Sequence, residues 1–335
     1  MKLDGLKRLG VVILFVQLLN ATAGAILMQA IVTRELTKVY ARIGRSAPAS
    51  LDRLDLSIGE SEVFGFLGRN GAGKTTSIKL ICSLLQPTRG HAMIFGEDCR
   101  LPRARRHIGY LPENAYFYEY LTPRETIDFF GRLQGLDGPS RTKEWNRLAE
   151  LFDLGGIRDQ RVRTFSKGMR QRLGFAVALV GDPPLLILDE PMSGLDPLGR
   201  RLFRDVILKL RDDKKTIFFS SHVLGDVEQI CDRVGILVNG KLTVQGRLDQ
   251  LLERQIQLVE VILDGVDKQL EETLLRRSSA VRRSEAGTHF YVTTLDAGNE
   301  LVRAAMERGA ALVEFNPVRE SLEDYFMRSQ EAGRP

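Results

Sequence analysis

The sequence predicts an α/β fold built on a parallel β-sheet, and three stretches carry this prediction. "SEVFGFLGRNGAGKTTSIKL" (residues 61–80) is a β-rich apolar run, then a glycine-rich turn, then a helix-compatible segment. "LLILDE" (185–190) and "TIFFSSH" (216–222) are apolar runs that end in polar residues. Strands of a parallel sheet that are buried on both faces have this character, and their ligands bind beyond the carboxyl ends of the strands.

The glycine-rich turn matches a phosphate-binding loop. Gly68, Gly73, Lys74 and Thr75 satisfy the pattern G-x-x-x-x-G-K-[ST] between a predicted strand and a predicted helix. Glycines let successive backbone N–H groups approach phosphate oxygens, and the helix N-terminus adds its positive dipole end. We expect Lys74 to reach the β- and γ-phosphates and the Thr75 hydroxyl to ligate Mg²⁺. The predicted nucleotide contacts are Gly68, Arg69, Asn70, Gly71, Ala72, Gly73, Lys74, Thr75 and Thr76.

Acidic and polar residues follow the other two predicted strands. Asp189 and Glu190 come directly after the run 185–188. We expect Asp189 to hold Mg²⁺, directly or through water, and Glu190 to orient or deprotonate the attacking water. His222 follows the third strand and is a candidate for contact with the γ-phosphate. A lone histidine at a strand end is, however, more often an ordinary polar loop residue.

A second anion-binding pattern occurs at "FSKGM" (165–169). Ser166 is a good helix N-cap, Gly168 lets the backbone approach an anion, and "KGMRQRLGFAVALV" continues as a helix with one buried face. Ser166 lies 92 positions after Lys74, which leaves room for a helical subdomain between them. We therefore expect Ser166 and Gly168 to bind the nucleotide of a second copy packed head to tail.

Taken in order, "GRNGAGKT", "FSKGM", "LLILDE", "SGLD" and "SSH" resemble the nucleotide-binding domain of ABC-type ATPases over about Ile31–Asp264. The resemblance implies a P-loop NTPase fold with a RecA-like parallel sheet core, an antiparallel β subdomain and a helical subdomain. It implies ATP as substrate, Mg²⁺ as cofactor, and hydrolysis in a nucleotide-sandwich dimer.

The resemblance also implies a role for each motif. Tyr40 resembles the aromatic residue that stacks on adenine, and Glu113 stands at the Q-loop position, where its carboxylate is a further candidate for Mg²⁺. Phe165–Met169 corresponds to the signature motif, which binds ATP held by the partner subunit. The remaining correspondences are Asp189 and Glu190 to Walker B and the catalytic acid, Ser193–Asp196 to the D-loop, and His222 to the switch histidine.

Two residues depart from the commonest motifs of ABC-type ATPases and narrow the resemblance to one subfamily. Lys167 replaces the first glycine of the usual LSGGQ signature, and we hypothesise that its charge strengthens the contact with phosphate. Glu113 replaces the usual glutamine. Both variants resemble the ABC-2 type export ATPases. That resemblance implies two partners: an ABC-2 type membrane permease, and a second ATPase chain that is either another copy of this chain, forming a homodimer, or a different ABC ATPase. It also implies peripheral attachment to the cytoplasmic side of the cell membrane.

The chain is predicted to contain three segments. Residues 1–30 are an apolar N-terminal extension, 31–264 form the nucleotide-binding domain, and 265–335 form a C-terminal accessory domain. Strand-like "QLVEVIL", "THFYVTTL" and "AALVEF" alternate with helix-like segments near and after this boundary, so the appendage is predicted to be small and α+β. A regulatory or dimer-supporting role and a purely stabilising role both fit it.

The first thirty residues allow three interpretations. Their basic, apolar and small-residue order is that of a secretory signal, and the apolar run is short for a membrane span. "MQAIVTRELTKVY" is a natural domain start, so the preferred interpretation has Met28 as the initiator. A membrane-associated helix is second and cleaved export third. Cys82, Cys99 and Cys231 lack metal-ligand spacing and are expected to be reduced thiols.

The competing function is a soluble ABC ATPase that acts on ribosomes or DNA. The ribosome class carries two cassettes in one chain, whereas this chain has one Walker A pattern. The DNA-repair class needs a long coiled coil between Lys74 and Ser166, for which there is no room. A net charge of +5 does not by itself indicate nucleic acid, and no nucleic-acid partner is expected.

Overall fold

The computed structural model describes residues 29–40, 49–252 and 256–319. The chain divides into two compact units, residues 1–246 and 247–335. The predictions for residues 1–28, including Met28 as initiator, lie outside the described residues. Within the described part, no helix combines the length and the apolar character needed to cross a membrane.

The parallel sheet predicted from the sequence is present in the first unit. It has the order β10-β9-β3-β8-β7-β6, and the neighbours from β9 to β6 pair in parallel. The strands β3, β7 and β8 are buried along their whole length. The bounds are β3 Val63–Leu67, β6 Ile108–Leu111, β7 Leu185–Leu188, β8 Thr216–Ser221, β9 Arg233–Val238 and β10 Lys241–Arg247.

Register brings the ends of the three predicted strands to one edge of this sheet. Leu67 of β3 lies beside Ser221 of β8, and Leu188 of β7 lies beside Phe219 of β8. The glycine-rich loop, Asp189–Glu190 and His222 follow these ends, so residues far apart in sequence are gathered at one place. The β9–β10 hairpin turns at Asn239-Gly240, where both residues have positive φ, as a type I′ turn requires.

A second, antiparallel sheet covers the parallel one. It has the order β2-β1-β4-β5, with β1 Gln29–Lys38, β2 Leu51–Gly59, β4 Arg89–Ile94 and β5 Glu97–Asp98. Helix α2 (Lys74–Ile81) and both sheets contribute to one buried core. Members of this core include Leu54 and Ile58 of β2, Ile78 of α2, Ile94 of β4, and Phe66 and Phe218 of the parallel sheet. The predicted parallel core and antiparallel β subdomain are therefore confirmed.

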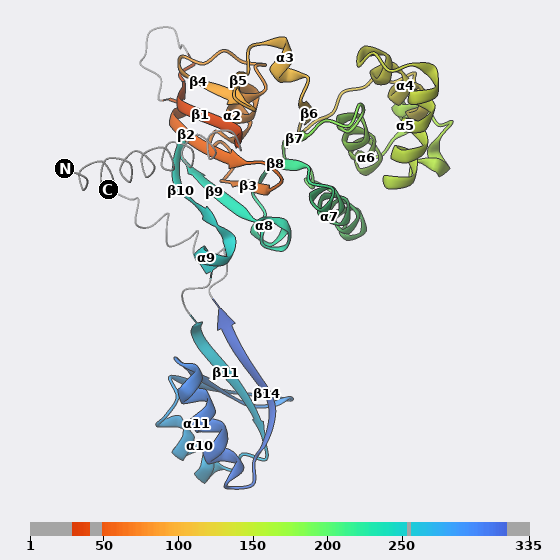
Figure 1. Ribbon diagram of the computed structural model, residues 1–335. Coiled ribbons are helices and arrows are strands. Elements are labelled where there is room, and N and C mark those ends of the chain that lie inside the picture. Colours follow the sequence, from red (N-terminus) through yellow and green to blue (C-terminus); the bar gives the residue numbers. More distant parts are fainter. Residues whose placement is uncertain (1–28, 41–48, 253–255, 320–335) are drawn as a thin grey trace, which may run out of the picture. The chain divides into compact units, whose positions relative to one another are not determined.

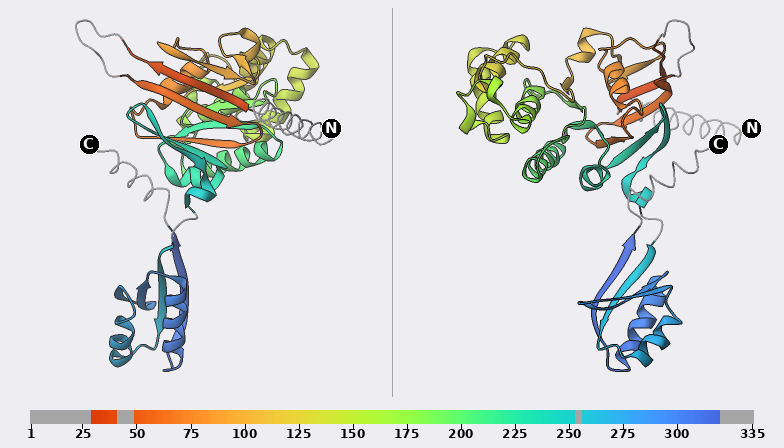
Figure 2. Two further views of the ribbon diagram at one scale, coloured as in Figure 1. Left: turned by 60° about the vertical axis from the view of Figure 1, so that its left-hand side comes forward. Right: turned by 180° about the vertical axis from the view of Figure 1, so that it is seen from behind.

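The predicted helical subdomain is also present, and Figures 1 and 2 show it standing to one side of the sheets. Its helices are α4 (Pro123–Leu133), α5 (Gly138–Leu151) and α6 (Lys167–Ala178). Thr122 and Glu125 form a reciprocal capping box at the start of α4, and Arg141 of α5 pairs with Asp128 of α4 at 2.6 Å. The described part of this unit also contains the helices α3 (Pro102–Arg105), α7 (Pro197–Asp212) and α8 (Leu224–Ile230), with short 3₁₀ turns at Gly155–Ile157 and Val162–Thr164.

The junction between β6 and α6 leaves no room for a side chain at Gly109. A Cβ on this glycine would lie 2.0 Å from the carbonyl oxygen of Ala178, at the end of α6. Gly109→Ala is therefore expected to lower the free energy of unfolding by about 1–3 kcal/mol, the usual cost of overpacking. Urea denaturation measures this loss. Gly156→Ala is the control because its Cβ would meet open space; equal stability of the two variants would contradict the packing described.

The second unit is an α+β domain, as predicted. Its sheet has the order β12-β13-β11-β14, and neighbouring strands pair antiparallel. Helices α10 and α11 contribute Leu270, Leu274 and Leu301 to its core. The bounds are α9 Leu248–Leu252, β11 Ile256–Asp264, α10 Lys268–Leu275, β12 Ala280–Ser284, β13 Gly287–Val292, α11 Leu295–Met306 and β14 Ala311–Arg319.

The boundary predicted between residues 264 and 265 differs from the division found in the structure. Strand β11 pairs with β13 and β14, and its residues Val259, Val261 and Leu263 belong to the core of the second unit. A boundary at 264 would remove the central strand from this sheet, and the two units instead divide between Gly246 and Arg247. Residues 320–335 of the predicted accessory domain lie outside the described residues.

Candidate functional site

A cavity of about 310 Å³ opens at the carboxyl edge of the parallel sheet. Most of the predicted loop lines it, together with Glu113, Glu190 and His222. The full lining is Ser50, Arg69, Asn70, Gly71, Gly73, Lys74, Thr75, Thr76, Glu113, Glu190, Ser193 and His222. Segments that follow β3, β6, β7 and β8 thus converge on one space, although they span more than 150 positions of the chain.

Gly71 and Gly73 suit their positions in the loop for different physical reasons. A Cβ on Gly73 would lie 2.6 Å from the Ser50 carbonyl oxygen, and Gly73 has a φ of +110°. Gly71 has a φ of +80°, but a Cβ there would meet no atom within 4 Å. Gly73 therefore fixes the loop against the protein. Gly71 leaves its backbone open toward the cavity, where a ligand can approach it.

Lys74 is held at the start of α2, inside the loop. Its Nζ donates to the carbonyl oxygen of Gly68 at 2.6 Å and lies 3.1 Å from Glu190 Oε1. The Lys74 side chain is 6% exposed and that of Glu190 is 11% exposed. Removing one partner of such a buried pair leaves an uncompensated charge. Without a nucleotide, Glu190 supplies the anion that faces this lysine.

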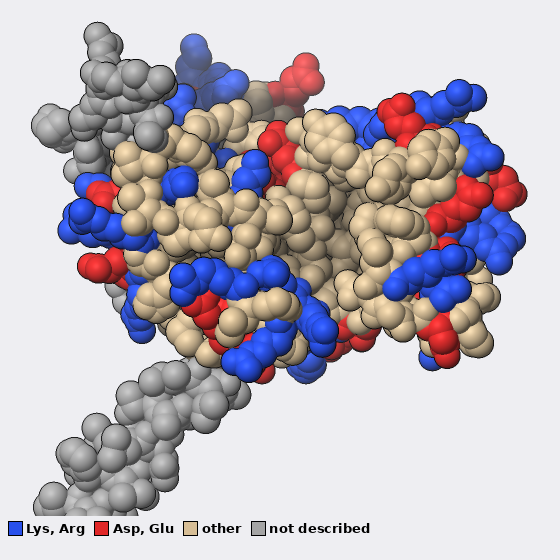
Figure 3. All heavy atoms as spheres, turned by 90° about the horizontal axis from the view of Figure 1, so that it is seen from above, with Lys and Arg blue, Asp and Glu red and all other residues tan. Residues whose placement is uncertain are grey.

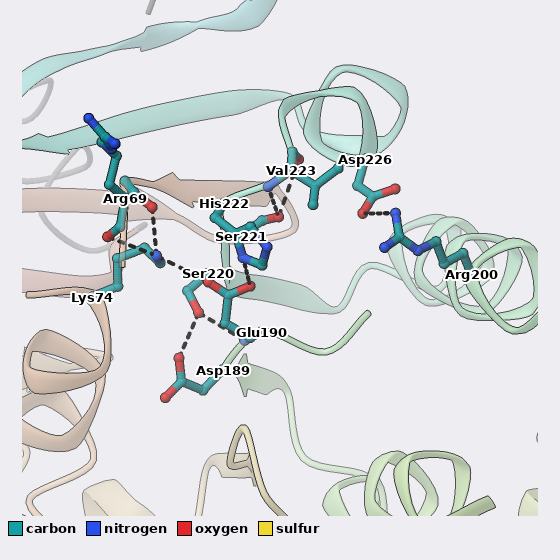
Figure 4. Close-up of polar contacts among 11 residues, drawn as sticks. Arg69, Lys74, Asp189, Glu190, Arg200, Ser220, Ser221, His222, Val223 and Asp226 are labelled. Atoms are coloured by element: carbon teal, nitrogen blue, oxygen red, sulfur yellow. Dashed lines mark hydrogen bonds and ion pairs between the residues drawn. The ribbon is translucent and has the colours of Figure 1, made fainter. Parts of the chain in front are cut away.

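Glu190 connects Lys74 to His222, and Figure 4 shows the three side chains pointing toward one another. Its Oε2 lies 2.8 Å from His222 Nδ1. Its backbone has a φ of +50°, which a non-glycine residue adopts at a cost, and its N–H donates to Ser220 Oγ at 2.9 Å. The strained backbone and the Ser220 bond together direct the Glu190 carboxylate into the cavity.

Asp189 lies just behind the cavity and does not line it. Ser220 Oγ donates to its Oδ1 at 2.7 Å, whereas its Oδ2 is buried without a hydrogen-bond partner in the structure. Burial raises the pKa of Asp189, the Ser220 and Thr75 hydroxyls oppose this rise, and the nearby carboxylates of Glu190 and Glu113 add to it. An unpaired, buried carboxylate oxygen beside two further acids fits a cation at this point.

The remaining predicted residues lie outside the cavity lining. Tyr40 is 47% exposed, and Lys38 Nζ lies over its ring, 5.5 Å from the ring centroid. The contact of Tyr40 with adenine stays a prediction. Gly68 and Ala72 belong to the loop but do not line the cavity. Ser166 caps α6, where its Oγ accepts from the Met169 N–H at 3.3 Å, and neither it nor Gly168 lines the cavity.

Ser50 lines the cavity although no motif marked it. Its hydroxyl lies 3.3 Å from that of Thr76, and its carbonyl oxygen packs against Gly73. It precedes β2, in a segment without a sequence pattern for nucleotide binding. No signal in the sequence identifies it. Ser193, by contrast, lies in the "SGLD" segment that the resemblance had already marked.

Comparison with known proteins decides the family. A family model described as "ABC transporter" matches residues 51–193. The ABC transporter ATP-binding protein sll0415 of Synechocystis is 40% identical over 305 residues, which cover 88% of this chain and 83% of that protein. This chain belongs to the ATP-binding proteins of ABC transporters. It is therefore an ABC-type ATPase, and the predicted P-loop NTPase fold with its RecA-like core is confirmed.

Two further comparisons agree with this membership. The bacitracin transport ATP-binding protein BcrA of Bacillus licheniformis is 35% identical, with 88% of this ABC ATPase and 95% of BcrA covered. A solved structure described as the ATP-binding subunit of an ABC transporter has a TM-score of 0.60 at 31% identity, over 66% of this chain and 91% of that one. These relatives favour a transport ATPase over the soluble alternative acting on ribosomes or DNA.

Proposed function

We propose that this ABC ATPase binds MgATP in a head-to-tail dimer and hydrolyses it to drive export through a separate membrane subunit of the ABC-2 type. The observation that supports the dimer most directly is the place of the signature residues. Ser166 and Gly168 do not line the cavity of their own chain, while the loop, Glu190 and His222 do. One chain thus supplies half of a site, and a second chain would supply the other half.

The triphosphate would bind along the loop 68–76. The open backbone at Gly71 and the N-terminus of α2 offer N–H groups to its oxygens. The γ-phosphate would take the place that Glu190 Oε1 now has beside Lys74 Nζ. This exchange keeps the buried lysine paired and frees the Glu190 carboxylate for water.

Mg²⁺ would be held by the Thr75 hydroxyl and Asp189, with Glu113 as a further carboxylate beside them. The unpartnered Oδ2 of Asp189 supports this assignment. Among the described residues no group of three or more His, Cys, Asp or Glu side chains could hold a metal by itself. Phosphate oxygens and water would therefore complete its shell. When bound, Mg²⁺ neutralises charge on the phosphates.

Glu190 would act on the attacking water and His222 would hold Glu190 in place. The 2.8 Å contact between His222 Nδ1 and Glu190 Oε2 leaves Oε1 to face the water once Lys74 pairs with phosphate. A carboxylate in hydrogen-bond reach of water can accept its proton as water attacks the γ-phosphorus. The His222 ring can then also approach the γ-phosphate from the opposite nitrogen.

The membrane partner would dock beside the segment that joins β6 to α4. Tyr116, Tyr118 and Tyr120 of this segment are 90%, 52% and 65% exposed, and large exposed aromatic residues mark interaction surfaces. Figure 3 shows this side of the first unit from above, with a central hollow that is bordered largely by uncharged atoms and with charged side chains scattered over the rest of the face. Docking there would hold the chain peripherally at the cytoplasmic side of the membrane. The likeness to BcrA, whose name states bacitracin transport, supports a transport role.

Lys74→Ala tests nucleotide binding. Loss of a charge-assisted contact with phosphate is worth about 1.5–3 kcal/mol, so the affinity for ATP should fall by roughly ten- to a hundredfold. Equilibrium titration with a fluorescent ATP analogue measures this fall. Lys79→Ala is the matched control, since Lys79 belongs to the same helix and is exposed. Unchanged affinity in Lys74→Ala would exclude the loop as the phosphate site.

Purification of a tagged chain from detergent-solubilised native membranes tests the partner. We expect a membrane protein with several spanning helices to copurify in a stoichiometric amount. Copurification of ribosomal or DNA-bound proteins with the chain, and of no such membrane protein, would contradict the proposal.

A further inference from the structure

Helix α6, which begins in the signature motif, packs against the turn formed by residues 191–195, and this turn follows Glu190. Gln171 Nε2 donates to the carbonyl oxygen of Pro191 at 2.9 Å, and Gln171 is 3% exposed. The place of a Cβ on Gly168 is 3.7 Å from Leu195 Cδ2, which is an ordinary van der Waals contact. The first two turns of α6 therefore pack directly on this turn.

Lys167 adds a third contact from the same face of α6, because positions i and i+4 of a helix are neighbours. A Cβ on Gly194 would lie 2.5 Å from Lys167 Nζ, 2.9 Å from Cε and 3.1 Å from Cδ. The end of the lysine side chain thus fills the space above Gly194, which has a φ of +71°. No hydrogen bond or ion pair joins Lys167 to another described residue, so this contact is one of packing.

The position of the turn 191–195 affects the position of the Glu190 side chain. Pro191 follows Glu190 directly, and the Ser193 N–H donates to the Glu190 carbonyl oxygen at 3.0 Å. The Glu190 backbone already has a strained φ of +50°. A shift of the turn away from α6 would therefore move the carboxylate that faces Lys74 and His222. Displacements of about 1 Å at a reacting group can cost about a hundredfold in rate.

We propose that Lys167 is a positioning residue, whose side chain holds the turn 191–195 on α6 through Gly194. The N-terminus of α6 carries Ser166, which in the proposed dimer faces the ATP of the partner subunit. Glu190 acts on the ATP of its own chain. Lys167 and Gln171 thereby couple the two sites within one chain. This inference rests on the proposed head-to-tail dimer, and it assigns Lys167 a role other than direct contact with phosphate.

Three variants of Lys167 and a control test the proposal. Lys167→Ala removes the stem and is expected to lower kcat for ATP about tenfold and to reduce the Hill coefficient toward 1, with ATP binding to the monomer unchanged. Lys167→Met keeps a long apolar stem without the charge and should retain at least about half of the wild-type kcat. Lys167→Arg should behave like Lys167→Met. Lys143→Ala, at an exposed position of α5, should match the wild type. Thermal melting of each variant checks that it is folded.

Equal losses in Lys167→Met and Lys167→Ala would overturn the proposal, since the charge and not the stem would then matter. Wild-type kcat in Lys167→Ala would overturn it as well. Neither result would affect the proposed ATPase function. An inactive wild-type chain, with nucleotide binding intact, would count against the proposed function itself.

A double variant gives an independent readout. Gly194→Ala places a methyl group where Lys167 now lies and should lower kcat strongly. In Lys167→Ala/Gly194→Ala the methyl has room, although the left-handed φ still costs about 1–2 kcal/mol. The double variant is therefore expected to be more active than Gly194→Ala alone. Strictly additive losses would show that the two residues do not interact and would overturn the inference.

Discussion

Glu190→Gln is expected to slow ATP hydrolysis by at least about 100-fold and to leave ATP binding intact, which is the scale of losing a general base. Glutamine has nearly the same shape as glutamate and keeps an oxygen toward His222, but it cannot accept a proton from water. Steady-state phosphate release gives the rate, and ATP titration gives the affinity. Glu150→Gln, at an exposed position of α5, is the control.

The ion pair with Lys74 sharpens this prediction. In the structure without a nucleotide, Glu190 Oε1 lies 3.1 Å from Lys74 Nζ and competes with the γ-phosphate for it. Glutamine competes less, so ATP should bind Glu190→Gln at least as tightly as the wild type. ADP, which lacks the γ-phosphate, should gain less than ATP. Near-normal turnover in Glu190→Gln would remove Glu190 from the mechanism.

The residues of this site that could be predicted are those whose position is determined by a local sequence pattern, such as an apolar strand or a glycine-rich loop. The uninterrupted apolar run 185–188 gave a buried strand, and the acids after it had to lie at the carboxyl edge of the sheet, beside the glycine loop. Gly73 was predicted as a loop residue, and its Cβ clash with the Ser50 carbonyl oxygen supplies the reason. Motif order and local pattern were sufficient for these residues.

Other features depend on contacts between distant segments and could not be predicted. The Lys74–Glu190 pair spans 116 positions, and the packing of Lys167 on Gly194 depends on how a helix meets a turn. The sequence suggested a phosphate contact for Lys167, whereas the structure directs its side chain to the turn. The predicted boundary after residue 264 followed the extent of the family resemblance, and it separated strand β11 from β13 and β14, with which this strand pairs.

Ser166→Arg is expected to abolish ATP-dependent dimerisation while leaving ATP binding to a single chain nearly intact. Ser166 does not line the cavity of its own chain, so a bulky side chain there should not disturb its own nucleotide. In the proposed dimer, the arginine would fill the space of the γ-phosphate across the interface. Size-exclusion chromatography with light scattering, in the Glu190→Gln background that preserves bound ATP, measures dimerisation.

Two controls separate this effect from a loss of fold. Ser140→Arg introduces the same side chain at an exposed position of α5 and should leave the dimer unchanged. Loss of the Ser166 cap costs about 1 kcal/mol on its own, and thermal melting should show no more than this.

Mixed dimers extend the test. A dimer of Ser166→Arg with Lys74→Ala chains has one composite site with both lesions and one with neither, while each variant alone has a lesion in both sites. Dimer formation in the mixture, absent from either variant alone, is the expected result. If Ser166→Arg instead destroys ATP affinity in a sample that is monomeric, then Ser166 serves the nucleotide of its own chain. The head-to-tail arrangement would then be wrong, because its main support is that the signature residues lie outside the cavity of their own chain.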